Sequence, residues 1–245
     1  MILDRLNQSR TSTTFVVGWA FRYGGPDISG KTLELIKHGC DRIISFPLFP
    51  QYSATTVASC NDQVFTALQH SRVQVALNTV NGYYSNEIFL GSIAKTIKNT
   101  LDEHKSVNFD LIIATYHGIP QRYETSGDPY PKQCYETTFL LREEISKLGI
   151  STKIVTAFQS RFGPHPWTKP YTDELVTDLA RKGYKNIAIV APGFSADCLE
   201  TLEELAMDLK EQFLEAGGKE FVYIPCLNDT EAGIDVIYDV VKNQI

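Results

Sequence analysis

One histidine occurs where a proton acceptor could be held in place. His117 ends the apolar run DLIIATYH, and Gly118 and Pro120 behind it predict a tight turn. Imidazole titrates near neutral pH, so a histidine fixed at the end of a strand can take a proton from a substrate. The alternative is a histidine that only satisfies a backbone carbonyl. The other four histidines lie on predicted helix ends or loops without the spacing of metal ligands: His38, His70, His104 and His165.

Three carboxylates follow another apolar run. Asp197, Glu200 and Glu204 are three and four residues apart, which predicts that they share one face of a helix. Such a row could relay protons or guide a hard cation. The alternative is a capping box from Asp197 to Glu200, favoured by the helix dipole. Glu204, which capping does not require, favours the functional interpretation.

Other strand ends carry aromatic and polar side chains. The segment 159–167, QSRFGPHPW, combines a cation with flat aromatic neighbours and could hold an anionic, planar ligand. The alternative is a proline-stiffened surface loop. Arg22 and Tyr23 invite the same two interpretations. Tyr52 and Ser53 follow a further strand, and their alternative is a helix N-cap.

An alternation of strands and helices would position these side chains. Seven apolar runs rich in β-branched and aromatic residues predict strands at Thr13 to Phe21, Arg42 to Phe49, Val73 to Val80, Phe109 to His117, Thr152 to Gln159, Asn186 to Ala191 and Phe221 to Leu227. Helical spacing follows each of them, at 28–38, 54–69, 85–104, 133–148, 172–182, 198–216 and 229–243. This alternation predicts an α/β fold in which helices cover both faces of parallel sheets.

The strand count suggests two Rossmann-like units. Three predicted strands precede residues 82–86 and four follow, so we expect a first unit of residues 1–84 plus 228–245 and a second of 85–227. The first sheet is then one strand short. Ligands of open parallel sheets bind beyond the carboxyl ends of the strands, where all the candidate residues lie. No strand is followed by G-x-G-x-x-G or G-x-x-x-x-G-K-[ST], which argues against dinucleotide and nucleoside triphosphate ligands.

Composition excludes several classes of protein. With 23 Lys and Arg against 29 Asp and Glu, the net charge is -6, so nucleic acid is not an expected partner. The apolar stretches are far shorter than the roughly 20 residues that span a bilayer. We therefore expect a cytoplasmic protein without a transmembrane segment, with peripheral membrane contact left open. Five scattered cysteines without a C-x-x-C pair predict reduced thiols.

The strand-end loops, taken together and in order, resemble the ferrochelatase family, whose members insert ferrous iron into a porphyrin to make haem. The matching stretches extend from about Val16 to Asn228 and are RYGGP, PLFPQYSATT, TYHGIPQRY, GDPYPKQC, FQSRFGPHPWTKPYTDE, PGFSADCLETLEE and IPCLND. The resemblance implies two similar four-stranded chelatase-type units with a porphyrin cleft between them. Relatives carry a further N-terminal stretch with the first strand of the first unit, which would account for the missing strand.

The resemblance also implies roles for individual residues. His117 and Glu200 correspond to the catalytic residues that handle the pyrrole protons or the metal. Asp197 and Glu204 look like members of an acidic path, so that all four are candidate metal ligands. Seven residues are candidate porphyrin contacts: Arg22, Tyr23, Tyr52, Ser53, Gln159, Ser160 and Trp167.

The function implied is that of a lyase in the final step of haem biosynthesis, acting on protoporphyrin IX and ferrous iron to form protohaem. No organic cofactor is expected because the metal is a substrate, and no iron-sulfur cluster is expected. Two alternatives stay open: a truncated porphyrin- or metal-binding module without turnover, and a chelatase for another tetrapyrrole.

Overall fold

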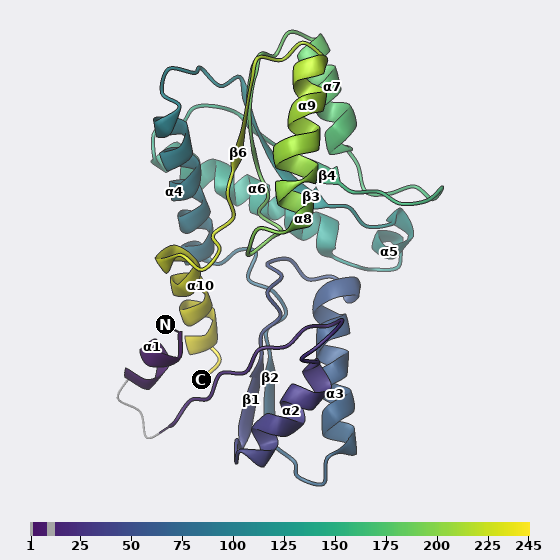
Figure 1. Ribbon diagram of the computed structural model, residues 1–245, viewed down its shortest axis with the longest axis vertical. Coiled ribbons are helices and arrows are strands. Elements are labelled where there is room, and N and C mark those ends of the chain that lie inside the picture. The colour runs from purple at the N-terminus through teal and green to yellow at the C-terminus, as the bar shows by residue number, and fades with distance from the viewer. Residues whose placement is uncertain (1, 9–12) are drawn as a thin grey trace. The chain divides into compact units, whose positions relative to one another are not determined.

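The structure is a computed structural model that describes residues 2–8 and 13–245 (Figure 1). The chain divides into two units, which we describe separately. The first is Met1–Tyr83 with Ile234–Ile245, and the second is Tyr84–Gly233.

The second unit is built on a four-stranded parallel sheet, as the sequence predicts. Its strands are β3 (Leu111–His117), β4 (Ile154–Gln159), β5 (Asn186–Val190) and β6 (Glu220–Ile224). Their spatial order is β4-β3-β5-β6, with every pair parallel. The chain runs from β3 outward to β4 and then returns to the other side of β3. The strand order therefore reverses between β3 and β5, and ligands of open α/β sheets bind at such a point.

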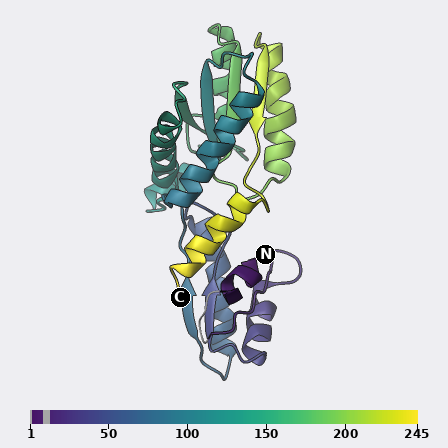
Figure 2. The same cartoon turned by 90° about the vertical axis from the view of Figure 1, so that its left-hand side faces the viewer.

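Helices cover both faces of this sheet. One side carries α4 (Glu87–Glu103) and α6 (Tyr130–Lys147), and the other carries α7 (Thr172–Arg181) and α9 (Lys210–Glu215) (Figures 1 and 2). Every residue of β3 except the last is buried. Strands covered on both faces need apolar side chains in both directions, which explains the unbroken run LIIATY.

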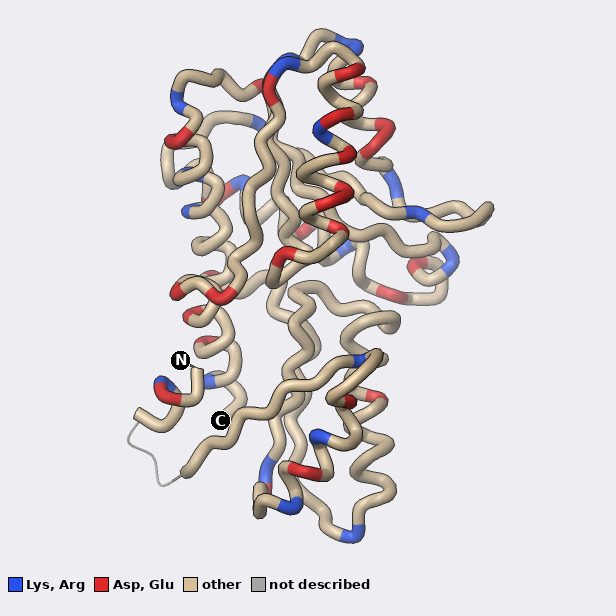
Figure 3. The backbone as a smooth tube through the Cα atoms, viewed as in Figure 1, with Lys and Arg blue, Asp and Glu red and all other residues tan. Residues whose placement is uncertain are grey.

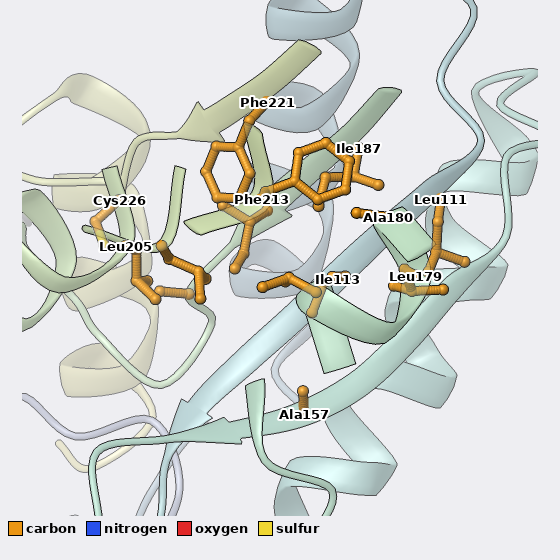
Figure 4. Packing of buried hydrophobic residues seen from close by; sticks show 14 residues of the cluster. Leu111, Ile113, Ala157, Leu179, Ala180, Ile187, Leu205, Phe213, Phe221 and Cys226 are labelled. Carbon is orange, nitrogen blue, oxygen red and sulfur yellow. The ribbon is translucent and has the colours of Figure 1, made fainter. Parts of the chain in front are cut away.

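An apolar cluster joins the sheet to α7 and α9 (Figure 4). Phe213 of α9 is fully buried, and its ring centroid lies 6.0 Å from that of Phe221 in β6. Leu205, Ile113 and Ile189 are also fully buried in this cluster. Each such side chain stabilises the fold by about 1.5–3 kcal/mol relative to an exposed one. The cluster therefore fixes the strands whose carboxyl ends carry the candidate residues.

The first unit has a smaller parallel sheet of two strands, β1 (Arg42–Ser45) and β2 (Ala76–Thr79). Its helices are α1 (Ile2–Gln8), α2 (Ile28–Lys37) and α3 (Ser59–His70), and a π-helical segment, η1 (Ala54–Ala58), precedes α3. The last helix, α10 (Glu231–Lys242), begins in the second unit and ends in the first. Asn78 Nδ2 donates to the Gln244 carbonyl at 2.8 Å and ties the chain end to β2.

The predicted strand from Thr13 to Phe21 is wrong. Within the described residues, this segment makes one isolated bridge, between Phe21 and Asp27, and belongs to no sheet. Val16 and Trp19 are more than half exposed. β-branched and aromatic residues favour a strand where a neighbouring strand and a core complete the pleated surface, and this segment has neither. The first sheet consequently has two strands rather than three.

The predicted helix at 198–216 is divided into three parts: α8 (Leu199–Leu202), the π-helical η2 (Glu204–Leu209) and α9. The short helices α1 and α5 (Gln121–Thr125) were not predicted. In the described part of the chain, no helix is both long and apolar enough to cross a bilayer.

Candidate active site

His117 lies at the carboxyl end of β3, opposite Gln159 of β4 in the sheet register. Its Nδ1 is 2.7 Å from the Gly118 carbonyl oxygen. Because a carbonyl only accepts hydrogen bonds, Nδ1 carries a hydrogen, and in the neutral imidazole the lone pair is then on Nε2. A hydrogen bond to a backbone carbonyl is the alternative to a catalytic role that the sequence leaves open for His117. This bond is present, and it fixes the tautomer that a proton acceptor needs.

Two aromatic side chains flank the imidazole. The ring centroid of Phe162 lies 6.5 Å from that of His117 with the rings inclined by 29°, and that of Trp167 lies 6.3 Å away. Trp167 Nε1 donates to the Phe162 carbonyl at 2.9 Å, which holds the loop between them closed. Phe162 is 66% exposed. An accessible apolar surface thus adjoins the histidine.

The loop that carries these aromatics is bonded to the turn after His117. Thr168 N donates to the Ile119 carbonyl at 2.9 Å, and Ile119 N donates to Thr168 Oγ1 at 3.2 Å. Gly118 permits this approach, because a Cβ there would lie 3.1 Å from the Gln159 carbonyl oxygen. Histidine turn and aromatic loop therefore form one hydrogen-bonded structure.

Glu200, in α8, is the carboxylate electrostatically coupled to His117. The Cys198 thiol donates a hydrogen bond to it and, with a backbone N–H and the charge of His117, holds the pKa of Glu200 below its usual range. Burial and the neighbouring Glu200 raise the pKa of Cys198 to about 11, so the thiol stays protonated at neutral pH. Gln159 Nε2 donates to the Glu200 carbonyl at 2.7 Å. The site thus pairs an imidazole with an ionised carboxylate.

Glu204, the first residue of η2, is held by the end of β4. Ser160 Oγ donates to its Oε2, and Gln159 Nε2 lies 3.4 Å from the same oxygen. Gln159 is only 6% exposed, and its Oε1 accepts from Thr115 at 3.3 Å. Gln159, expected as a porphyrin contact, is therefore occupied inside the protein, whereas Ser160 is half-buried beside the carboxylate.

A cavity of about 340 Å³ opens beside Glu204. Arg161 lines it, forms two hydrogen bonds to the carboxylate of Asp173 at 2.8 and 3.2 Å, and lies 4.1 Å over the ring of Tyr171. Asp208, one turn beyond Glu204, also faces the cavity. The acidic residues of the α8–η2–α9 segment are visible in Figure 3.

The expectation that Asp197, Glu200 and Glu204 share one helical face is wrong. Asp197 precedes Cys198, the N-cap of α8, and a π-helical segment begins at Glu204. The capping box is formed by Cys198 and Thr201, not by Asp197 and Glu200. Burial would raise the pKa of Asp197, but hydrogen bonds from surrounding side chains outweigh it and leave that pKa below its usual range. The sequence singled out neither Tyr223 nor Asn228, which donate two of these bonds.

The remaining predicted residues belong to the first unit. Arg22 Nε donates to Ser59 Oγ at 2.7 Å, and its guanidinium lies 4.6 Å over the ring of Tyr23, which is 79% exposed. Tyr52 is half-buried. Ser53 is buried, and its Oγ caps η1 by accepting from a backbone N–H, as the alternative interpretation expects.

Across residues 2–8 and 13–245, no three His, Cys, Asp or Glu side chains are grouped closely enough to hold a metal ion. In this part of the chain, the four candidate metal ligands therefore do not form one metal-binding cluster.

A family model described as Ferrochelatase matches residues 2–245. A ferrochelatase of a Chelativorans species is 47% identical over 232 residues, which cover 94% of this chain and 64% of that protein. The ferrochelatase of Brucella ovis is 47% identical over 231 residues, with the same coverage. This chain therefore spans just under two thirds of the length of these curated relatives.

Solved structures with the same fold include SirB from Bacillus subtilis with Fe3+, with a TM-score of 0.68 and 14% identity over 99% of this chain and 86% of that one. The sirohydrochlorin chelatase SirB of subspecies spizizenii, in complex with cobalt, has a TM-score of 0.61 and 11% identity over 99% of this chain and 85% of that one. At such identities the likeness concerns the fold alone, and it confirms the predicted chelatase-type α/β architecture.

Proposed function

The chain belongs to the ferrochelatase family, and from that premise we propose that it inserts ferrous iron into protoporphyrin IX to form protohaem. One observation carries the proposal: an imidazole whose Nδ1 is held by a backbone carbonyl is coupled to a carboxylate of lowered pKa where the strand order of the second sheet reverses.

Metal insertion requires acceptors for two protons. A porphyrin loses two pyrrole protons when a divalent metal takes their place, so a base must reach the face of the macrocycle. His117 Nε2 accepts one pyrrole proton, the neighbouring Glu200 stabilises the imidazolium that forms, and water accepts the second proton. Because the Gly118 carbonyl already holds Nδ1, the ring does not have to reorient when it is protonated.

The macrocycle and the metal need separate contacts. Phe162 and Trp167 offer an apolar surface beside His117 for a flat ring. In the first unit, Arg22 and Tyr23 are further candidate contacts for the porphyrin and its carboxylates. Glu204, with its carboxylate fixed by Ser160, is suited to exchange for water on hydrated ferrous iron. The reaction needs no organic cofactor, since the metal is itself a substrate.

The test is an anaerobic insertion assay on the 245-residue chain with protoporphyrin IX and ferrous or zinc ion. Loss of porphyrin fluorescence is followed against a boiled control. We expect turnover in the parent chain, and a loss of about 100-fold or more in His117→Ala and in Glu200→Gln. Porphyrin binding, measured separately, should be retained in both variants.

Two matched variants control for the loss of a histidine or a carboxylate. His70 makes the same kind of bond, from Nδ1 to a backbone carbonyl at 2.8 Å, but at an exposed helix end. Glu203 is an exposed neighbour of Glu204. His70→Ala and Glu203→Gln should keep the parent turnover. Full turnover in both His117→Ala and Glu200→Gln would refute the mechanism, and porphyrin binding without turnover in the parent would favour a binding module.

A further inference from the structure

The carboxylate of Asp197 is surrounded by protein donors. Tyr223 Oη lies 2.5 Å and Thr201 Oγ1 3.1 Å from Oδ1, and the Cys226 backbone N–H lies 3.4 Å from the same oxygen. Asn228 Nδ2 donates to Oδ2 at 2.7 Å. Three of these donors therefore approach Oδ1 and one approaches Oδ2, while the single hydrogen of the Thr201 hydroxyl can also be donated to the Cys198 carbonyl at 3.1 Å. A metal ion or a migrating proton at Oδ1 would have to displace these donors.

Asn228 contacts both the side chain and the backbone of Asp197. Its Nδ2 donates to the carboxylate, and its Oδ1 accepts from Asp197 N at 2.7 Å. Its own backbone N–H donates to the Ser195 carbonyl at 3.0 Å. Asn228 has φ of 53°, in the left-handed region that asparagine tolerates better than most residues. The loop after β6 is therefore fastened to the loop after β5.

This fastening is transmitted to the start of α8. Thr201 is fully buried, and its Oγ1 accepts from Cys198 N at 3.0 Å while lying within hydrogen-bond distance of Asp197. In the sequence, Glu200 lies between Cys198 and Thr201. The first turn of α8, and with it the direction of the Glu200 side chain, therefore depends on Asp197 and its donors.

We propose that Asp197, Tyr223 and Asn228 form an anchor that positions Glu200, and that Asp197 is neither a metal ligand nor a proton relay. This inference rests on the proposed function and adds Tyr223 and Asn228 to the site as positioning residues. It differs from the role in an acidic path that the resemblance implies for Asp197.

An exchange of the two partners tests the anchor. Asp197→Asn places an amide donor opposite the donor Asn228 Nδ2. Asn228→Asp places a second carboxylate opposite the carboxylate of Asp197. Each single variant should lower kcat about 10- to 100-fold and change the KM for porphyrin about threefold or less. The double variant restores one donor and one acceptor at the contact. It should therefore recover to within about threefold of the parent kcat.

A metal ligand or proton relay at position 197 gives a different result. The double variant still lacks a carboxylate there, so it would be as slow as Asp197→Asn, and that outcome would overturn the proposal. Parent-like kcat in both single variants would overturn it as well. Asp229→Asn, which removes an exposed carboxylate next to Asn228, is the matched control and should keep the parent kcat.

A structural measurement separates this inference from the proposed function. Amide hydrogen exchange over residues 195–201 should be faster in both single variants and return to the parent rate in the double variant. If the parent chain inserts no metal, the proposed function fails, while the exchange rates still decide whether the anchor exists. Unchanged exchange in the single variants would refute it.

Discussion

The carboxyl edges of the two sheets are built differently. In the second unit, side chains that follow different strands bond to one another: Ser160, after β4, donates to Glu204, and Asn228, after β6, donates to Asp197. In the first unit, two long-range side-chain bonds, at the end of β1 and the start of α3, end on uncharged acceptors: Ser45 Oγ donates to Asn61 Oδ1 at 2.7 Å, and Arg22 Nε donates to Ser59 Oγ. Ser53 caps the helical segment that it precedes, and Asp27 caps α2. Long-range hydrogen bonds to carboxylates thus mark the edge with the candidate chemistry, whereas these two long-range bonds of the first unit end on neutral acceptors.

Burial of the strands follows the same division. Four of the five residues of β5 are buried, while Ile43 is the buried residue of β1 and β2 has none. A sheet enclosed on both faces can hold side chains at its edge in fixed positions. The larger sheet of the second unit therefore gives the side chains at its own edge the more rigid support.

Matched core substitutions should show the largest difference between the units. Ile189→Ala in β5 should lower the free energy of unfolding toward the upper end of about 2–5 kcal/mol, and Ile43→Ala in β1 toward the lower end. Ile189 is fully buried and Ile43 is 7% exposed beside a two-stranded sheet.

Urea unfolding can follow the units separately, because the chain has two tryptophans, Trp19 in the first unit and Trp167 in the second. Trp19→Phe and Trp167→Phe backgrounds assign the fluorescence change to one unit each. Equal losses in the two isoleucine variants would mean that the smaller sheet is as well enclosed as the larger one.

A methyl group at the histidine turn should have the next largest effect. Gly118→Ala places its Cβ 3.1 and 3.3 Å from the backbone carbonyl oxygens of Gln159 and Ser160, which cannot move independently of β4. We expect a loss of about 1–3 kcal/mol in the free energy of unfolding. Gly91→Ala is the control, because nothing lies within 4 Å of a Cβ in that position of α4. It should raise stability by about 0.5–1 kcal/mol; thermal melting distinguishes the two outcomes.

Some of the architecture follows from the sequence alone. Patterns predict all four strands of the second unit because strands covered on both faces are continuous apolar runs, as in β3 and β5. An apolar run also predicts a strand at Thr13 to Phe21, and there the prediction fails. Composition alone does not reveal whether a neighbouring strand is present to form hydrogen bonds with the segment. The π-helical i→i+5 hydrogen bonds of η2 likewise cannot be predicted from a sequence pattern based on the α-helical period.

The candidate site is predictable residue by residue but not in its contacts. Strand ends and the family resemblance single out His117, Glu200 and Glu204. The surroundings of Asp197 depend on Tyr223 and Asn228, more than 25 residues further along the chain. Tyr223 directly precedes the segment IPCLND, which contains Asn228 and is recognisable as a strand end, but the sequence does not show which other strand end it contacts.

Acid should weaken the second unit through Asp197. Its folded pKa is below the usual value, so the stabilisation that it contributes is present above the unfolded pKa and is lost as the pH falls through the folded pKa. Between about pH 5 and pH 3, the parent chain should therefore lose more stability than Asp197→Asn. Urea unfolding of the Trp19→Phe background over this range measures the difference. Parallel pH profiles would contradict the predicted linkage.

Surface ion pairs should show the smallest effects in both units. Arg161 pairs with Asp173 and Glu174, and Lys31 pairs with Glu34, all with partly exposed side chains. Arg161→Gln and Lys31→Gln should each cost about 1 kcal/mol or less, and less still in high salt. If the Arg161→Gln variant still loses clearly more stability than this at high salt, the packing of Arg161 on Tyr171 contributes to stability as well as its charge.

The backbone bonds between residues 119–121 and 166–168 limit how this site can be altered. The Ile119 carbonyl accepts a hydrogen bond from Thr168 N, and Gln121 N donates to the Pro166 carbonyl. Between them, Pro120 and Trp167 form an isolated antiparallel β-bridge. A substitution of Trp167 will therefore also move the histidine turn. Phe162, which is exposed and lies outside this paired stretch, can be varied with less effect on the base. A substitution of Phe162 thus changes the ring beside His117 without touching the paired backbone, whereas a substitution of Trp167 changes both.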